Sequence, residues 1–119
     1  MKRSKPIEPV LLGAFEEQVM LAVVRTGRDA YGMNVRRELE DVTGRDVTIG
    51  SVYATLDRLE AKGLLTSSRI AAQADVPSRR IFAASTAGLQ SLLLTRATRD
   101  RLWSGITLDR FVHTCVNSE

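Results

Sequence analysis

The chain has 119 residues, of which 44% are hydrophobic and 26% charged, which is typical of one globular domain and excludes an intrinsically disordered chain. The formal net charge of +3 permits a polyanionic partner, but such a surplus is also common in ordinary soluble proteins. One cysteine and one histidine exclude a disulfide framework, a cysteine-based zinc finger and an iron–sulfur cluster.

The amino terminus begins with three cations, as a signal peptide does. Pro6, Glu8 and Pro9 interrupt the apolar run that follows, so a signal sequence is not predicted. No apolar stretch approaches the roughly 18 residues that a membrane-spanning helix needs. We therefore expect a cytoplasmic protein with a loose basic tail and no membrane partner.

Two amphipathic helices are predicted first. From Pro9 onward apolar residues repeat at steps of three and four, which predicts a helix that ends near Thr26. Its apolar stripe contains Leu12, Phe15, Val19, Leu21, Ala22 and Val23. A second helix is predicted from Tyr31 to Val42, because Gly44 follows closely and glycine is the usual left-handed residue after a helix.

The third helix has the clearest boundaries. Thr48 is a suitable N-cap, since its hydroxyl can accept a hydrogen bond from a free amide of the first turn, and Gly63 ends the helix. On a helical wheel Val52, Leu56 and Leu59 gather on one side and form the buried face. Residues 44–47 then form the tight turn between the second and third helices.

Beyond the third helix the hydrophobic period changes. Residues 64–71 and 79–84 read as two short strands, and Pro77 lies between them, so the pair predicts a β-hairpin. Ser85 can cap a last helix, which is predicted to continue to about Thr114 and to span roughly 45 Å. Part of this helix must project from the domain, and Ser104-Gly105 can kink it.

The order helix, helix, turn, helix, hairpin predicts a winged helix-turn-helix. The fold class is mostly α (α+β), with a two-stranded wing and a C-terminal dimerisation helix. We expect residues 1–84 to form the DNA-binding domain and residues 85–119 to form the dimerisation helix.

In such folds the third helix enters the DNA major groove with its first residues at the base edges. Ser51, Ala54, Arg58 and Lys62 share the face opposite Val52, so small groups come first and long cations follow. Arg58 is the strongest candidate for bidentate recognition of guanine. The alternative is that this face is simply solvated.

Two tyrosines and the hairpin supply further candidates. The Tyr53 hydroxyl either holds a phosphate or is the wet tip of a boundary residue, and the same two interpretations apply to Tyr31, where helix amides can bind phosphate. The hairpin carries three arginines against the single acid Asp75, so they either contact the DNA backbone or only solubilise the hairpin. The residues expected at the DNA are Tyr31, Thr48, Ser51, Tyr53, Ala54, Arg58, Lys62, Arg69, Arg79 and Arg80.

Three segments, in the correct order, resemble those of PadR-type bacterial regulators. They are residues 30–40 (AYGMNVRRELE), residues 48–64 (TIGSVYATLDRLEAKGL) and residues 79–88 (RRIFAASTAG). The wing departs from the family pattern, since residues 76–78 (VPS) stand where the family has Gly-Gly-Arg. The resemblance implies a homodimeric transcription regulator of double-stranded DNA, often a repressor, whose dimer is built by a C-terminal helix. It also implies that a hydrophobic small molecule can act as effector.

A projecting helix with exposed apolar residues would be an aggregation liability in a monomer. We therefore expect a homodimer with Leu102, Trp103, Ile106 and Phe111 at its interface, and an inverted-repeat operator with recognition helices about 34 Å apart. Trp103 either fills the dimer core or lines an apolar cavity between the subunits, where a flat hydrophobic effector could stack.

Catalysis has little support in the sequence. His113 and Cys115 fall on opposite faces of any helix and have no third group to orient a base, so we expect no enzyme activity, no cofactor and no metal. The main alternative function is a winged-helix module that binds protein and not DNA. A continuous basic face from Arg58 to the wing favours DNA, whereas interruption by acids such as Asp57 and Asp46 favours protein binding.

Overall fold

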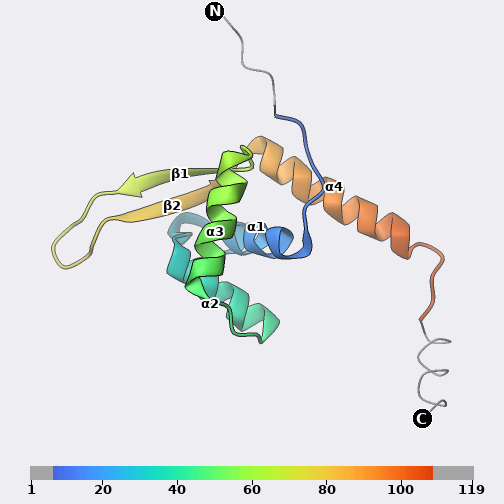
Figure 1. Ribbon diagram of the computed structural model, residues 1–119, viewed down its shortest axis with the longest axis horizontal. Coiled ribbons are helices and arrows are strands. Elements are labelled where there is room, and N and C mark those ends of the chain that lie inside the picture. The colour runs from blue at the N-terminus through green and yellow to red at the C-terminus, as the bar shows by residue number, and fades with distance from the viewer. Residues whose placement is uncertain (1–6, 109–119) are drawn as a thin grey trace, which may run out of the picture.

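The architecture is a core of three helices with a two-stranded wing and a fourth helix, and the computed structural model describes residues 7–108 (Figure 1). In chain order the elements are α1 (Ala14–Thr26), the short 3₁₀ turn η1 (Gly27–Asp29), α2 (Gly32–Thr43), α3 (Ile49–Ala61), β1 (Leu65–Ile70), β2 (Arg79–Ala84) and α4 (Thr86–Trp103). In Figure 1 the wing and α4 extend to opposite sides of the three-helix core. This arrangement confirms the predicted winged helix-turn-helix.

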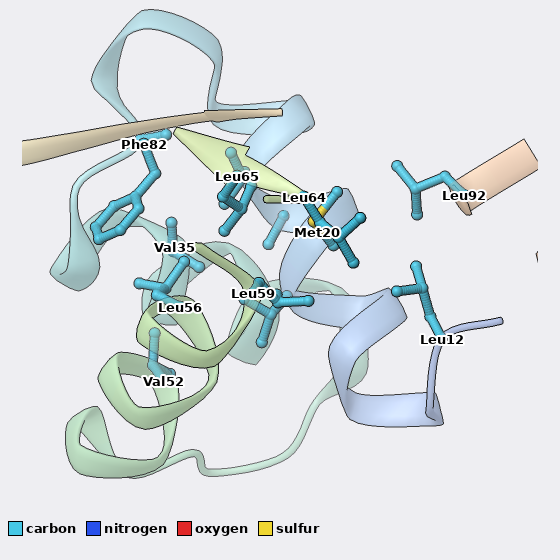
Figure 2. Close-up of a cluster of buried hydrophobic side chains, with 14 of the residues drawn as sticks. Leu12, Met20, Val35, Val52, Leu56, Leu59, Leu64, Leu65, Phe82 and Leu92 are labelled. Carbon is cyan, nitrogen blue, oxygen red and sulfur yellow. The ribbon is translucent and has the colours of Figure 1, made fainter. Parts of the chain in front are cut away.

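One hydrophobic core joins α1, α2, α3 and the base of the wing (Figure 2). Its fully buried side chains include Val19, Met20, Val35, Val52, Leu56, Leu59, Leu64, Leu65 and Phe82. Burial of a side chain of this size stabilises a fold by about 1.5–3 kcal/mol. The amide of Phe82 also donates to the carbonyl of Ala30 over 2.8 Å, which fixes β2 against the start of α2.

The first helix begins later than the sequence predicts, because residues 9–13 are not helical. This segment lies along α4, where the amides of Val10 and Leu12 donate to the hydroxyls of Ser91 and Thr95, each over 3.0 Å. These hydrogen bonds give the segment backbone partners on α4, so it does not need to be helical.

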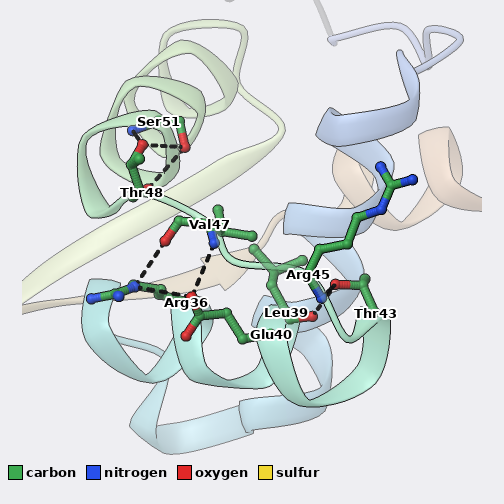
Figure 3. Close-up of polar contacts among 8 residues, drawn as sticks. All are labelled: Arg36, Leu39, Glu40, Thr43, Arg45, Val47, Thr48 and Ser51. Carbon is green, nitrogen blue, oxygen red and sulfur yellow. Dashed lines mark hydrogen bonds and ion pairs between the residues drawn. The ribbon is translucent and has the colours of Figure 1, made fainter.

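The turn between α2 and α3 is held from within α2 (Figure 3). Gly44 adopts the predicted left-handed conformation, with φ 70°. Arg36 Nε donates to the carbonyl of Val47 over 2.9 Å, and the amide of Val47 donates to Glu40 Oε2 over 2.9 Å. The amide and the carbonyl of Val47, the residue before the start of α3, are therefore both held by side chains of α2. Thr48 caps α3 as predicted, since its hydroxyl accepts a hydrogen bond from the first turn.

The wing is an antiparallel pair of strands whose register runs from Leu65 opposite Ala84 to Ile70 opposite Arg79. Both strands match the predicted segments to within a residue. The wing begins directly after α3 and ends directly before α4, so its base is tied to both helices.

The start of α4 packs closely on the end of α3. Ser85 caps α4 as predicted: its hydroxyl accepts from the amide of Gly88 over 3.0 Å and donates to the carbonyl of Gly63 over 2.7 Å. A Cβ atom at position 88 would lie 2.0 Å from the carbonyl oxygen of Leu64. Only glycine permits this approach of α4 to the end of α3.

The predicted continuation of the last helix to Thr114 is wrong, since α4 ends at Trp103. Gly105 has φ 79°, in the left-handed region, and it therefore terminates the helix where the sequence suggested a kink. Residues 104–108 are not helical. Phe111, together with the rest of the predicted helix from residue 109 onward, lies outside the described residues.

Candidate nucleic-acid interface

The outward face of α3 consists of small residues around one carboxylate. At about 100° per residue, the side opposite the core is centred on Gly50, Ala54, Asp57 and Ala61. All four residues are exposed, and the side chain of Asp57 is 58% exposed. The sequence-based prediction placed Arg58 on this face, but in the structure Arg58 lies at its edge.

Arg58 and Lys62 occupy the flank of α3 that faces α1, where both contact Glu16. Lys62 Nζ is 2.8 Å and Arg58 Nε 3.4 Å from Glu16 Oε2. The hydrogen bond from Lys62 lowers the pKa of Glu16 below its usual value; burial opposes this effect, and the amide of Gly13 and the Arg58 guanidinium reinforce it. The two predicted DNA-binding cations are therefore partly neutralised in the free protein.

Arg80 joins the wing to α3 through two carboxylates. Its Nη1 is 2.9 Å from Asp57 Oδ1, and its Nη2 is 2.7 Å from Glu60 Oε1. Burial disfavours the charged guanidinium, but the hydrogen bonds and charges of these two carboxylates outweigh burial and raise the pKa of Arg80. Asp75 is the single acid within the hairpin sequence, but α3 supplies two further carboxylates that contact Arg80.

The other two wing arginines have no acidic partner within residues 7–108. Arg69 donates to the hydroxyl of Ser78 over 3.3 Å, and the guanidinium of Arg79 lies 4.4 Å above the ring of Tyr31. The basic surface is thus interrupted by acids rather than continuous. This charge pattern, taken alone, favours the protein-binding alternative.

The start of α2 gathers groups that suit an anion. Tyr31 is the N-cap, and its side chain makes no capping hydrogen bond. A Cβ atom at Gly32 would lie 2.3 Å from Tyr53 Cζ, so the ring of Tyr53 packs directly on the first turn of α2. Its hydroxyl and the Arg79 guanidinium above Tyr31 therefore come close to the positive end of the helix dipole.

The first turn of α3 carries two hydroxyls that bond to each other. Thr48 Oγ1 donates to Ser51 Oγ over 3.0 Å, and Ser51 Oγ donates to the carbonyl of Thr48 over 2.8 Å. Arg45, in the preceding turn, lines a shallow groove beside them and is exposed. Sequence reasoning missed Arg45 as a candidate, although it lies in the predicted turn.

Sequence reasoning also missed three residues that position the interface. Arg36 and Glu40 fix the turn before α3, and their spacing of four residues within a helix was a usable signal. Glu16 holds Arg58 and Lys62 but is 42 residues from Arg58 in the chain, so no local pattern indicates the contact.

The predicted dimer residues that are described are exposed. The exposed fractions are 70% for Leu102, 56% for Trp103 and 50% for Ile106. A groove of about 580 Å³ also runs between α1 and α4, and its apolar lining comes from Leu21, Val24, Leu89, Leu92 and Leu93. Leu21, predicted within the buried stripe of the first helix, is 43% exposed and lies in this groove.

Across residues 7–108, none of the helices has both the length and the apolar character required to cross a membrane. The same residues contain no cluster of three or more His, Cys, Asp or Glu side chains that could hold a metal ion.

A capped helix with a small outward face, next to a two-stranded wing, defines the winged helix-turn-helix class of proteins. The sequence profile of the transcriptional regulator PadR-like family matches residues 20–93, and the chain belongs to that family. The protein is therefore a DNA-binding transcriptional regulator and not an enzyme, as predicted.

Solved structures agree with this assignment. A PadR family transcriptional regulator from Eggerthella lenta DSM 2243 is 28% identical, with a TM-score of 0.59 over 73% of this chain and 75% of that one. RosR of H. salinarum is 26% identical, with a TM-score of 0.62 over 90% of this chain and 92% of that one. A PadR-like transcription factor from Bacteroides fragilis, at 22% identity and a TM-score of 0.64 over 74% of this chain and 82% of that one, shows the same fold. None of the curated proteins matches the sequence significantly.

Proposed function

We propose that the protein is a homodimeric repressor that binds an inverted-repeat operator in double-stranded DNA through α3 and the wing. The outward face of α3 carries the proposal, because Gly50, Ala54 and Ala61 have no atoms beyond Cβ and leave room for the helix deep in the major groove. A regulator of this kind acts in the cytoplasm, where it meets its operator.

The start of α2 holds a backbone phosphate in this proposal. Free amides at a helix N-terminus favour an anion, and the Tyr53 hydroxyl and Arg79 would complete the site. Tyr31 supports Arg79 from below, at 4.4 Å. This contact positions the protein on the duplex without reading sequence.

The remaining cations surround α3. On binding DNA, Arg58 and Lys62 leave Glu16 and contact phosphates, because DNA offers a denser negative charge than one carboxylate. Arg58 can alternatively bind guanine. Arg69 and Arg79 of the wing follow the backbone on the other flank, whereas Arg80 stays bound to Asp57 and Glu60. The other proposed contacts, on α3 and its two caps, are Thr48, Ser51, Arg58 and Lys62.

The homodimer forms through the second half of α4 and the residues that follow, within the segment 85–119. Leu102, Trp103 and Ile106 are exposed apolar residues that a symmetric partner would cover. To read two half-sites one turn of DNA apart, the dimer would hold its recognition helices about 34 Å apart. Trp103 of each subunit lines an apolar cavity in which a flat hydrophobic effector changes that spacing and releases DNA.

Gel shifts with genomic fragments, the chain's own promoter included, test this proposal across a series of salt concentrations. We expect Arg79→Ala to weaken binding to every sequence and to flatten the dependence of log K on log salt by about 0.9 per protomer. Arg25→Ala is the matched control, because Arg25 pairs with Glu38 between α1 and α2, over 2.7 Å. Equal slopes for both variants and the unmodified protein would exclude a phosphate contact at Arg79.

A further inference from the structure

The outward face of α3 contains one side chain that can reach a base, and it is an acid. Gly50, Ala54 and Ala61 end at or before Cβ, so Asp57 extends furthest from this face. Its side chain is 58% exposed, although α3 packs in the core on its other side. At the centre of this face the group available to a base edge is therefore a carboxylate, whereas Arg58 lies at the edge of the face.

An ionised carboxylate selects among base edges because it only accepts hydrogen bonds. In the major groove the cytosine N4 and adenine N6 amino groups donate, whereas guanine O6 and N7 and thymine O4 accept. Acidic side chains pair with cytosine N4 in this groove, while adenine is matched by side chains that both donate and accept.

Arg80 reduces the electrostatic cost of an acid at DNA. Its Nη1 binds Asp57 Oδ1 over 2.9 Å, which holds the side chain in one orientation and offsets part of its charge, because Glu60 shares the same guanidinium. Asp57 Oδ2 makes no hydrogen bond to any of residues 7–108 and stays available to a donor. Glu60 binds the other arm of Arg80 over 2.7 Å, so the guanidinium is anchored on both sides.

We propose that Asp57 is a specificity-determining residue that selects cytosine by accepting a hydrogen bond from its N4 amino group. This proposal rests on the proposed function, because it assumes that α3 lies in the major groove. It predicts one C·G base pair at a matching position in each half-site of the operator.

The test is selection of binding sites from a random-sequence duplex library by the full chain and by three variants. The unmodified protein is expected to select a fixed cytosine in both half-sites. Asp57→Asn should replace that cytosine by adenine, because asparagine binds adenine N6 and N7 together. Asp57→Ala should lose the preference at that position alone, with discrimination falling about tenfold.

Asp41→Asn is the matched control, since Asp41 is an exposed acid of α2 outside every ion pair among residues 7–108. It removes the same charge and should leave the selected sequence unchanged. Circular dichroism confirms that each variant is folded.

The outcomes separate the two proposals. A common operator selected by the unmodified protein and by Asp57→Asn overturns the role of Asp57 and leaves DNA binding intact. A site without cytosine in both half-sites overturns it as well. If the unmodified protein enriches no sequence, the proposed function fails and the role of Asp57 fails with it.

Discussion

Replacing Glu16 by glutamine should weaken the fold and strengthen DNA binding at the same time. Glutamine keeps the oxygen that accepts from the amide of Gly13, so the start of α1 is preserved, but it loses the charge that faces Arg58 and Lys62. The cations are about half exposed, and pairs of this kind contribute roughly 0.2–1 kcal/mol each. We therefore expect the free energy of unfolding to fall by about 1 kcal/mol.

The gain in DNA binding follows from the summed charge of residue 16, Arg58 and Lys62, which rises from +1 to +2. One further neutralised phosphate steepens the dependence of log K on log salt by about 0.9 per protomer. At that slope, the affinity difference between 1 M and 0.1 M salt grows about eightfold per protomer. Gel shifts or fluorescence anisotropy on a nonspecific duplex at five or more salt concentrations measure this slope.

Glu38→Gln is the control for general charge. Glu38 pairs with Arg25 over 2.7 Å and lies between α1 and α2, away from the contact between Glu16 and α3. Both variants gain one positive charge, but only Glu16→Gln releases cations next to the recognition helix. Indistinguishable slopes for the two variants would show that Glu16 does not restrain DNA-binding cations, and so would a loss of affinity in Glu16→Gln.

Three further outcomes are expected. The pKa of Glu16 is lower in the folded protein than its usual value of 4.5, so the ionised carboxylate stabilises the fold fully above that value. This stabilisation is lost as the pH falls through the folded-state pKa. The free energies of unfolding in urea of Glu16→Gln and the unmodified protein should therefore become equal in acid. Gly88→Ala places a Cβ 2.0 Å from a backbone oxygen and should lower the free energy of unfolding by about 1–3 kcal/mol. At Gly50 an added Cβ meets nothing within 4 Å, so Gly50→Ala should leave stability unchanged or raise it. Calorimetry that gives equal melting temperatures for the two variants would contradict this. Leu102→Asp should yield monomers in sedimentation at concentrations where the unmodified chain is dimeric, and a monomeric unmodified chain would remove the dimer.

Local signals in the sequence were sufficient for most element boundaries. Thr48 and Ser85 are N-caps, and Gly44 adopts the left-handed conformation, because each of these features depends on residues within one helical turn. Such signals placed α2, α3 and both strands. They also placed the start of α4.

Contacts between distant residues account for what the sequence could not predict. Residues 9–13 have helical periodicity, but the amide of Val10 bonds to Ser91, 81 residues away. The orientation of Asp57 on α3 also depends on a distant residue, because Arg80, 23 residues further along the chain, binds its carboxylate. A helical period of about 100° per residue is enough to place Asp57 near the centre of the polar side of α3, but it does not reveal the contact of Asp57 with Arg80.

Cleavage of DNA by a reagent tethered to α3 shows where this helix lies on the operator. Ala54→Cys in a Cys115→Ser background offers one thiol on the outward face of α3, to which an iron chelate can be attached. Hydroxyl radicals should then cut the operator in two clusters, one in each half-site, with centres about 34 Å apart along the duplex. Ala97→Cys, exposed on α4, serves as the control and should not reproduce those clusters. Operator binding without cleavage from position 54, or with the same cuts from position 97, would contradict the placement of α3 in the major groove.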